Sequence, residues 1–149
     1  MVSMIDALFW FSSLYILPFW LMMWFAPNHA RTKQMMSNEW LFLAPLLVAY
    51  SLAVAPHVLD ILLAFSSEMP TPESVVEMFD EDDIILVGWL HFLAFDLLAG
   101  RWTWQRLTEH QQPIFVTLPV LFLSMMVAPL GCLVGMLVTQ ISTEPPSQL

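Results

Sequence analysis

The chain has 149 residues, of which 58% are hydrophobic and 11% are charged. Soluble domains contain about 45–50% apolar and about 25% charged residues, so this composition excludes an ordinary soluble domain. The formal net charge of −9 argues against nucleic-acid binding, and a single cysteine, Cys132, excludes an internal disulfide framework. The sequence therefore predicts an integral membrane protein.

Four apolar stretches are long enough to cross a membrane as helices, which takes about 20 residues each. They cover residues 5–26, 40–65, 84–104 and 114–141. No Lys or Arg precedes the first stretch and no small-residue cleavage motif follows it, so we expect a retained helix. Strict alternation of polar and apolar residues is missing, which argues against a β-barrel. We predict an all-α membrane protein whose four transmembrane helices form a single domain, residues 1–149.

The basic residues predict the orientation of these helices. Two of the four, Arg31 and Lys33, follow the first helix, and Arg101 and Arg106 lie at the end of the third. Cytoplasmic connections are enriched in Lys and Arg, so we expect residues 27–39 and 105–113 in the cytoplasm. Both termini then lie on the non-cytoplasmic side.

The connection 66–83 is the predicted acidic outer loop. Its acidic residues are Glu68, Glu73, Glu77, Asp80, Glu81, Asp82 and Asp83. Thr71 followed by Pro72 is typical of a helix start, with the threonine as N-cap. The ligand spacing and central glycine of a calcium-binding loop are missing, so we interpret the segment as a solvated loop.

Five ionisable residues lie inside the predicted helices. A charged group at the centre of a membrane helix costs about 2.5–3.5 kcal/mol on insertion scales, so such residues are candidates for function. They are His57, Asp60, His91, Asp96 and Arg101. Arg101 also has a simpler interpretation, because its long side chain can anchor the helix at the interface.

Asp96 is the strongest of these candidates. It follows Ile84 by 12 residues, which places it about 18 Å into the bilayer. Trp89, Phe92 and Gly100 share its helix face, so two aromatic rings and a gap for close backbone approach accompany the carboxyl group. The alternative is a structural pair with Arg101 or with a backbone group of another helix. His91 lies on another face, about 140° around the helix.

His57 and Asp60 share one face of the second helix. Counting from the helix ends places His57 and His91 at nearly the same depth on antiparallel neighbours. Such a pair suits a haem or metal ligand set, or proton exchange through Asp60. An interhelical hydrogen bond worth about 1 kcal/mol is the simpler interpretation, and we assign no metal site.

Proline and glycine mark irregular points in two helices. Pro56 leaves a carbonyl without its helical partner and permits a bend before His57. Pro129 is followed by Gly131 and Gly135, a G-x-x-x-G spacing that permits close helix contact within the bundle or between copies.

The stretch from Trp89 to Trp102, WLHFLAFDLLAGRW, resembles the W-x-H-x-x-A-F-D-L-x-x-G-R-W signature of the ABA DEFICIENT 4-like (ABA4-like) membrane family. Leu17-Pro18-Phe19-Trp20-Leu21-Met22, followed by Ala26-Pro27, is similar to the first helix of that family. Ala128-Pro129-Leu130-Gly131 is similar to its G-P-x-G, with alanine for the first glycine. The resemblance extends over residues 5–140.

The resemblance implies a role in carotenoid metabolism, because the plant namesake is required to form neoxanthin from violaxanthin. That conversion opens an epoxide and forms an allene without redox change. A carotenoid isomerase of this type needs an acid and a base. Our mechanistic hypothesis makes Asp96 the acid, His91 the base or proton relay and Arg101 an orienting charge. Trp89, Phe92, Gly100, His57 and Asp60 are then expected to bind the ligand.

Two other functions stay open. The chain fits a non-catalytic, pigment-binding subunit of a photosynthetic membrane complex, with His57 or His91 as axial ligand to chlorophyll. It also fits a proton or small-solute pathway through Asp60, His57, His91 and Asp96. We expect a bacterial or cyanobacterial plasma or thylakoid membrane, a bound carotenoid or chlorophyll, and no nucleic-acid partner.

Overall fold

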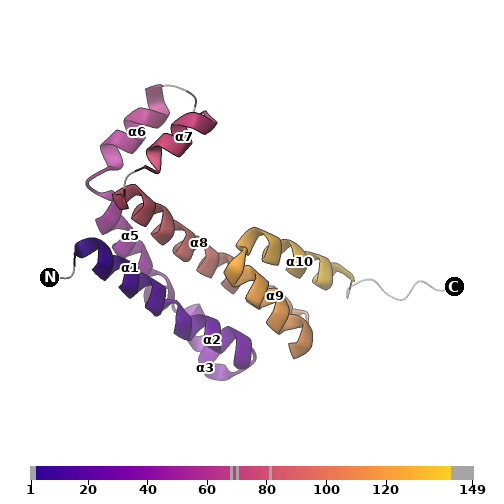
Figure 1. The fold of residues 1–149 in the computed structure, drawn as a ribbon. Coiled ribbons are helices and arrows are strands. Elements are labelled where there is room, and N and C mark those ends of the chain that lie inside the picture. Colours follow the sequence, from indigo (N-terminus) through magenta and orange to yellow (C-terminus); the bar gives the residue numbers. More distant parts are fainter. Residues whose placement is uncertain (1–2, 68, 70, 81, 142–149) are drawn as a thin grey trace. The chain divides into compact units, whose positions relative to one another are not determined.

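The computed structural model describes residues 3–67, 69, 71–80 and 82–141, and all regular secondary structure among them is helical (Figure 1). Glu68 and Glu81 of the predicted acidic loop lie outside the described residues. The helices are α1 (Met4–Tyr15), α2 (Leu17–Phe25), α3 (Ala30–Ser37), α4 (Glu39–Phe42), α5 (Ala44–Val54), α6 (Val58–Ser67), α7 (Pro72–Met78), α8 (Asp82–Glu109), α9 (Ile114–Met126) and α10 (Ala128–Ile141). The all-helical prediction is confirmed for this part of the chain.

Two helical stretches are long and apolar enough to cross a membrane, judged by length and composition. They are Met4–Phe25, which includes α1 and α2, and Asp82–Glu109, which is α8. The first and third predicted helices thus correspond to these stretches. The helix expected after Thr71 is also present: Thr71 Oγ1 accepts a hydrogen bond from Ser74 N (3.2 Å), and Ser74 Oγ accepts one from Thr71 N (2.9 Å).

The second predicted helix, 40–65, is not continuous. It is divided into α4, α5 and α6, and residues 55–57 separate the last two. Pro56 lies in that gap and cannot donate the backbone hydrogen bond that a continuing helix needs. The sequence correctly marked the bend but underestimated it.

The prediction of one helix over 114–141 is wrong, although both of its outer ends are correct. The chain leaves the helical conformation at Val127 (φ −145°, ψ 79°) and starts α10 at Ala128. A Cβ atom added at Gly131 would overlap the backbone of Ser124, and one added at Gly135 would lie 3.5 Å from Val120 Cγ1. Because these pairs approach each other in reverse order, α9 and α10 form an antiparallel hairpin (Figure 1).

The chain divides into two compact units. Unit 1 comprises Met1–Tyr15 and Ala44–Ala94, and unit 2 comprises Ile16–Leu43 and Phe95–Leu149. The residues of α8 up to Ala94 therefore belong to unit 1 and those from Phe95 onward to unit 2.

Unit 1 has an apolar core in which α1, α5 and the start of α8 meet. Its buried members are Ala53, Leu86, Val87 and Leu90. The Tyr50 and His91 rings lie 5.8 Å apart and His57 lies 3.6 Å from Asp83, so α5 runs antiparallel to α8. This direction is the one expected of consecutive membrane helices joined by a loop.

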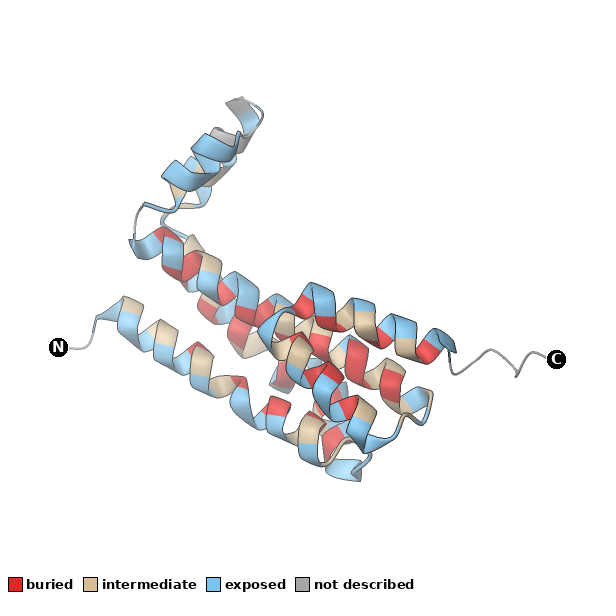
Figure 2. Ribbon diagram, turned by 45° about the vertical axis from the view of Figure 1, so that its right-hand side comes forward, coloured by how far each residue is buried: buried red, intermediate tan, exposed pale blue. Residues whose placement is uncertain are grey.

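Unit 2 buries several hydroxyl side chains together with large apolar side chains such as Trp20 and Phe42, while Phe25 and Phe115 are exposed. Its helices accordingly carry both buried and exposed residues (Figure 2). The buried hydroxyl residues are Thr32, Thr103, Thr117, Ser124 and Thr139. Each hydroxyl is within 3.2 Å of a backbone carbonyl oxygen, so none is left without a partner. This distribution is typical of helices that face lipid.

Candidate functional site

Asp96 occupies α8 in unit 2 and is partly buried. No described residue forms a hydrogen bond or ion pair with its carboxyl group. Gly100 follows it by one turn on the same face, and a Cβ added there would overlap the ring of Trp20. The predicted gap at Gly100 thus exists, and the indole of α2 fills it.

α10 packs along α8 beyond Asp96. The Cys132 thiol lies 3.7 Å from the Ala99 carbonyl oxygen and 3.2 Å from Thr103 Oγ1. Further along both helices, Arg106 Nε donates to Thr139 Oγ1 at 2.7 Å. The two helices therefore run in the same direction. One turn back along this register, the start of α10 at Ala128 comes level with Asp96.

Arg101 does not pair with Asp96. Its Nη1 lies 3.5 Å from Glu39 Oε1, and its guanidinium group lies 5.5 Å from the centroid of the Phe42 ring. The Arg101 side chain is only 19% exposed, whereas that of Glu39 is 72% exposed. The structural ion pair between Asp96 and Arg101, considered from the sequence, is therefore not formed.

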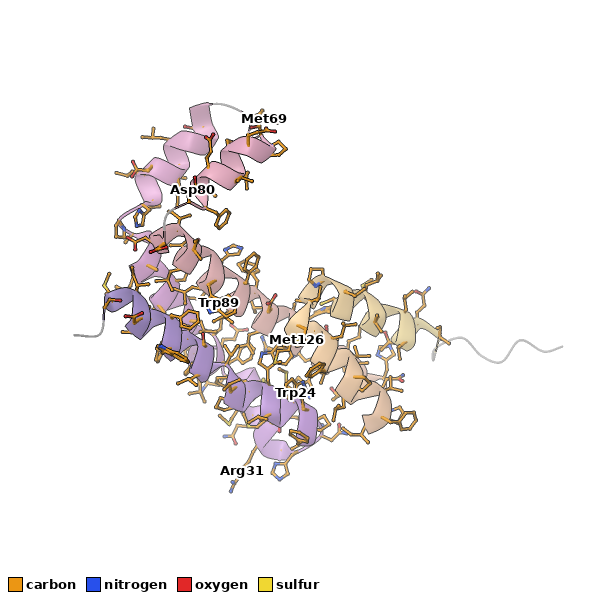
Figure 3. All side chains as sticks on the ribbon, viewed as in Figure 1. Trp24, Arg31, Met69, Asp80, Trp89 and Met126 are labelled. Carbon is orange, nitrogen blue, oxygen red and sulfur yellow. The ribbon has the colours of Figure 1, made fainter. Side chains whose placement is uncertain are left out.

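Unit 2 also holds buried donors without an acceptor among the described residues. These are the indole Nε1 atoms of Trp20 and Trp24 and Nε of Arg101. The two indole rings are 6.1 Å apart, and Trp24 lies 5.7 Å from the Phe122 ring of α9 (Figure 3). Sequence reasoning did not assign Trp20 and Trp24 to the site, although their i, i+4 spacing places both on one face of α2.

The remaining aromatic candidates on α8 belong to unit 1. Trp89 donates from Nε1 to Ser13 Oγ at 3.1 Å and stacks on Phe9 at 5.7 Å (Figure 3). The Phe92 side chain is 59% exposed, and its ring lies 6.4 Å from that of His91. Trp89 thus faces α1 as a packing residue, while Phe92 lies outside the core of unit 1.

His57 and His91 do not form the pair suggested by their calculated depths. His57 Nε2 lies 3.6 Å from Asp83 Oδ2, and His91 lies beside Tyr50. The depths estimated by counting residues from the helix ends were wrong, because the helix breaks at Pro56. This break shifts His57 toward the start of α8. Among the described residues, no group of three or more His, Cys, Asp or Glu side chains could hold a metal ion.

Two cavities in unit 1 adjoin His57. The first, about 240 Å³, is also lined by Ser3, Pro56 and Asp83. The second, about 480 Å³, is lined by Asp60 and Glu77 in addition to His57. Asp60 therefore faces the acidic segment around α7 within unit 1, whereas Asp96 belongs to unit 2.

The family model described as ABA DEFICIENT 4-like matches residues 7–134. The chain belongs to this family. The matched region extends from α1 into α10 and includes Asp96, Gly100 and Arg101. Membership implies a role related to the carotenoid and abscisic acid pathway. No curated protein and no solved structure matches the chain.

Proposed function

We propose that this ABA4-like chain is embedded in a bacterial or cyanobacterial membrane, where it binds an oxygenated carotenoid and isomerises it by opening an epoxide. The observation that carries this proposal is the set of buried donors in unit 2, the unit that also holds Asp96. A buried donor without an acceptor costs about 1–3 kcal/mol. A ligand that is mostly hydrocarbon but has one or two acceptor oxygens would satisfy these donors without adding charge.

The proposed chemistry uses Asp96 as a general acid. Apolar surroundings favour the protonated form of a carboxylic acid, which then donates its proton to the epoxide oxygen. The C–O bond breaks and the oxygen becomes a hydroxyl group. A base removes a proton from a neighbouring polyene carbon, and the electron pair of that C–H bond forms the allene. The substrate loses one proton and gains one, so the reaction is a non-redox isomerisation.

Arg101 has the supporting role in this proposal. The family-like stretch on α8 that contains Arg101 also contains His91, which belongs to unit 1. Arg101 orients the ligand through its Nε, which has no acceptor among the described residues. The aromatic rings of Trp20 and Trp24 line the apolar part of the ligand.

The membrane orientation is part of the proposal. The basic segments around α3 and at the end of α8 lie in the cytoplasm, and the acidic segment around α7 lies on the opposite side. The stretches Met4–Phe25 and Asp82–Glu109 cross the membrane, and the segment from α4 to α6 crosses it between them.

The acid is tested with Asp96→Asn, assayed on a 5,6-epoxy carotenoid in lipid nanodiscs by chromatographic separation of the pigments. We expect conversion to fall by about 10²–10⁴-fold, the usual contribution of a general acid, while the pigment still binds. Glu109→Gln is the matched control, since it removes a carboxylate from the exposed end of the same helix. Full conversion by Asp96→Asn would refute the acid role.

The binding role of the indole donors is tested with Trp20→Phe, which keeps an aromatic ring and removes the N–H. We expect weaker binding of the epoxy carotenoid and unchanged binding of β-carotene, which has no oxygen. Equal loss of both pigments would assign Trp20 to packing alone. Purification of the wild-type chain with chlorophyll, and without any conversion of carotenoid, would favour the pigment-binding subunit instead.

A further inference from the structure

We infer that residues 114–141 form a re-entrant hairpin, which enters the membrane and returns to the side from which it came. The end of α10 then lies on the same side as Arg106 and the connection before α9. This inference rests on the proposed membrane location. It replaces the expectation that both termini share the non-cytoplasmic side, because the chain then crosses the membrane an odd number of times.

The first observation is the tight contact between the two arms. Gly131 lies so close to Ser124 that no Cβ fits, and Gly135 approaches Val120. In a straight helix, residues 120 and 135 would be about 22 Å apart. The small side chains at 131 and 135 therefore serve contact between α9 and α10 themselves, and Gly135 also contacts Thr103 of α8.

The second observation is the direction of α10. Its residues Cys132 and Thr139 contact Thr103 and Arg106 of α8, respectively. A fourth crossing helix after α8 would have to run opposite to α8. The observed parallel direction instead brings Ile141, the last residue of α10, to the end of α8 that carries Arg106.

The third observation is the surface of the hairpin. No charged residue occurs between Ile114 and Ile141, and the exposed side chains include Phe115, Phe122, Leu133 and Leu137. The arms have 13 and 14 residues, so each is about 20 Å long, short of the 30 Å or so of the hydrocarbon core. The hairpin is apolar enough to enter the bilayer and too short to cross it.

Backbone amides at the turn between α9 and α10 have hydrogen-bond partners within the protein. Irregular backbone at membrane depth must be satisfied by the protein. Val127 N donates to Leu123 O at 2.8 Å, and the amides of Leu130 and Gly131 each donate to Val127 O at 3.0 Å. Ala128, at the tip, is only 5% exposed.

A cross-linking experiment tests the direction of α10. Thr103→Cys provides a partner for the native Cys132, because the side-chain oxygen that the new sulfur replaces lies 3.2 Å from Sγ of Cys132. We expect oxidation to form an intramolecular disulfide between residues 103 and 132. To detect it, a protease site is inserted between Gln111 and Pro113, and the two fragments stay joined after cleavage if the disulfide is present. A single crossing helix would place residues 103 and 132 about 18 Å apart along the helix axes. In that case no cross-link forms, which would overturn the hairpin. Thr103→Cys in a Cys132→Ala chain is the control.

Labelling from one side of the membrane tests the topology independently. In a Cys132→Ala background, single cysteines are introduced as Glu109→Cys, Gln140→Cys and Asp80→Cys, all at exposed positions. We expect a membrane-impermeant maleimide to label positions 109 and 140 from one side and position 80 from the other. Labelling of position 140 together with position 80 would overturn the hairpin and leave the membrane location intact. Labelling of all three from one side, or release of the protein by alkaline carbonate, would instead overturn the proposed membrane location.

Discussion

The two units of this chain are stabilised by different kinds of contact. Unit 1 packs through an apolar core around Ala53 and Leu90, and its polar contact between His57 and Asp83 lies at a partly exposed position. Unit 2 is stabilised by close backbone approach at Gly131 and by hydroxyl groups buried against carbonyl oxygens, such as those of Thr103 and Thr139.

This difference predicts which positions of the chain tolerate substitution least. An apolar core tolerates exchange among hydrophobic residues of similar volume, at a cost usually below about 1.5 kcal/mol. A glycine against a backbone, or a hydroxyl that is the acceptor of a guanidinium group, has no equivalent replacement. We therefore expect substitutions in unit 2 to cost more than matched substitutions in unit 1.

The largest effect is expected for Gly131→Ala. The new methyl group would overlap the backbone of Ser124, which cannot move without opening the α9–α10 hairpin. We expect unfolding in detergent to require about 3 kcal/mol less, measured by thermal denaturation. Gly88→Ala is the matched change in unit 1, where the methyl group meets only the flexible end of Phe79 at 2.8 Å. Its cost should stay below about 1 kcal/mol, and equal costs for the two variants would contradict the comparison.

Thr139→Val should have the next largest effect. The substitution keeps the shape of the side chain and leaves Arg106 Nε without its acceptor at 2.7 Å. Because hydrogen bonds to charged groups are worth about 1.5–3 kcal/mol, we expect a loss of about 2 kcal/mol in the free energy of unfolding. Thr117→Val removes a hydroxyl that donates to the neutral carbonyl of Gln112 at 3.2 Å, and should cost about 1 kcal/mol. A larger loss for Thr117→Val would show that the charge on Arg106 is unimportant.

A smaller effect is expected in unit 1 for Trp89→Phe. This change removes the hydrogen bond from the indole to Ser13 and keeps an aromatic ring against Phe9. We expect the free energy of unfolding to fall by about 1 kcal/mol. Tryptophan fluorescence during denaturation measures this loss. Trp102→Phe, at a 43% exposed side chain of unit 2, should change stability by less than half as much. If both variants behave alike, the contact with Ser13 contributes nothing.

Glu39→Gln should have the smallest effect. The Glu39 side chain is 72% exposed, and surface ion pairs contribute about 0–1 kcal/mol. We expect a change below about 0.5 kcal/mol that disappears in high salt, read from melting temperatures at two ionic strengths. A loss that persists in high salt would mean that the pair with Arg101 is shielded from solvent.

The sequence predicted where helices begin and end better than where they break. Thr71 and Pro72 start α7, and Ile114 and Ile141 bound the α9–α10 segment, because caps and apolar runs are local properties. Pro129 signalled an irregularity, but it could not distinguish a kink from a complete reversal. The reversal depends on the contact between Gly131 and Ser124, which no local pattern specifies.

The candidate site was predicted in part. Helical periodicity placed Trp89 and Gly100 on the face of Asp96 as expected ligand-binding residues, but it could not predict their packing partners, which are Ser13 for Trp89 and Trp20 for Gly100. The partners of the charged residues were not predictable. Arg101 meets Glu39 and His57 meets Asp83 because α4 and the break at Pro56 set the register between segments far apart in the sequence.

Cys132 gives the hairpin a built-in spectroscopic probe. Its thiol lies between Thr103 Oγ1 and the Ala99 carbonyl oxygen, at 3.2 Å and 3.7 Å. The S–H stretching vibration falls in a region of the infrared spectrum where other protein groups do not absorb, and its frequency decreases as the thiol donates a stronger hydrogen bond. With a single cysteine in the sequence, that band belongs to one bond. It would follow the separation of α8 and α10 in an intact membrane, without a label, as ligand is added.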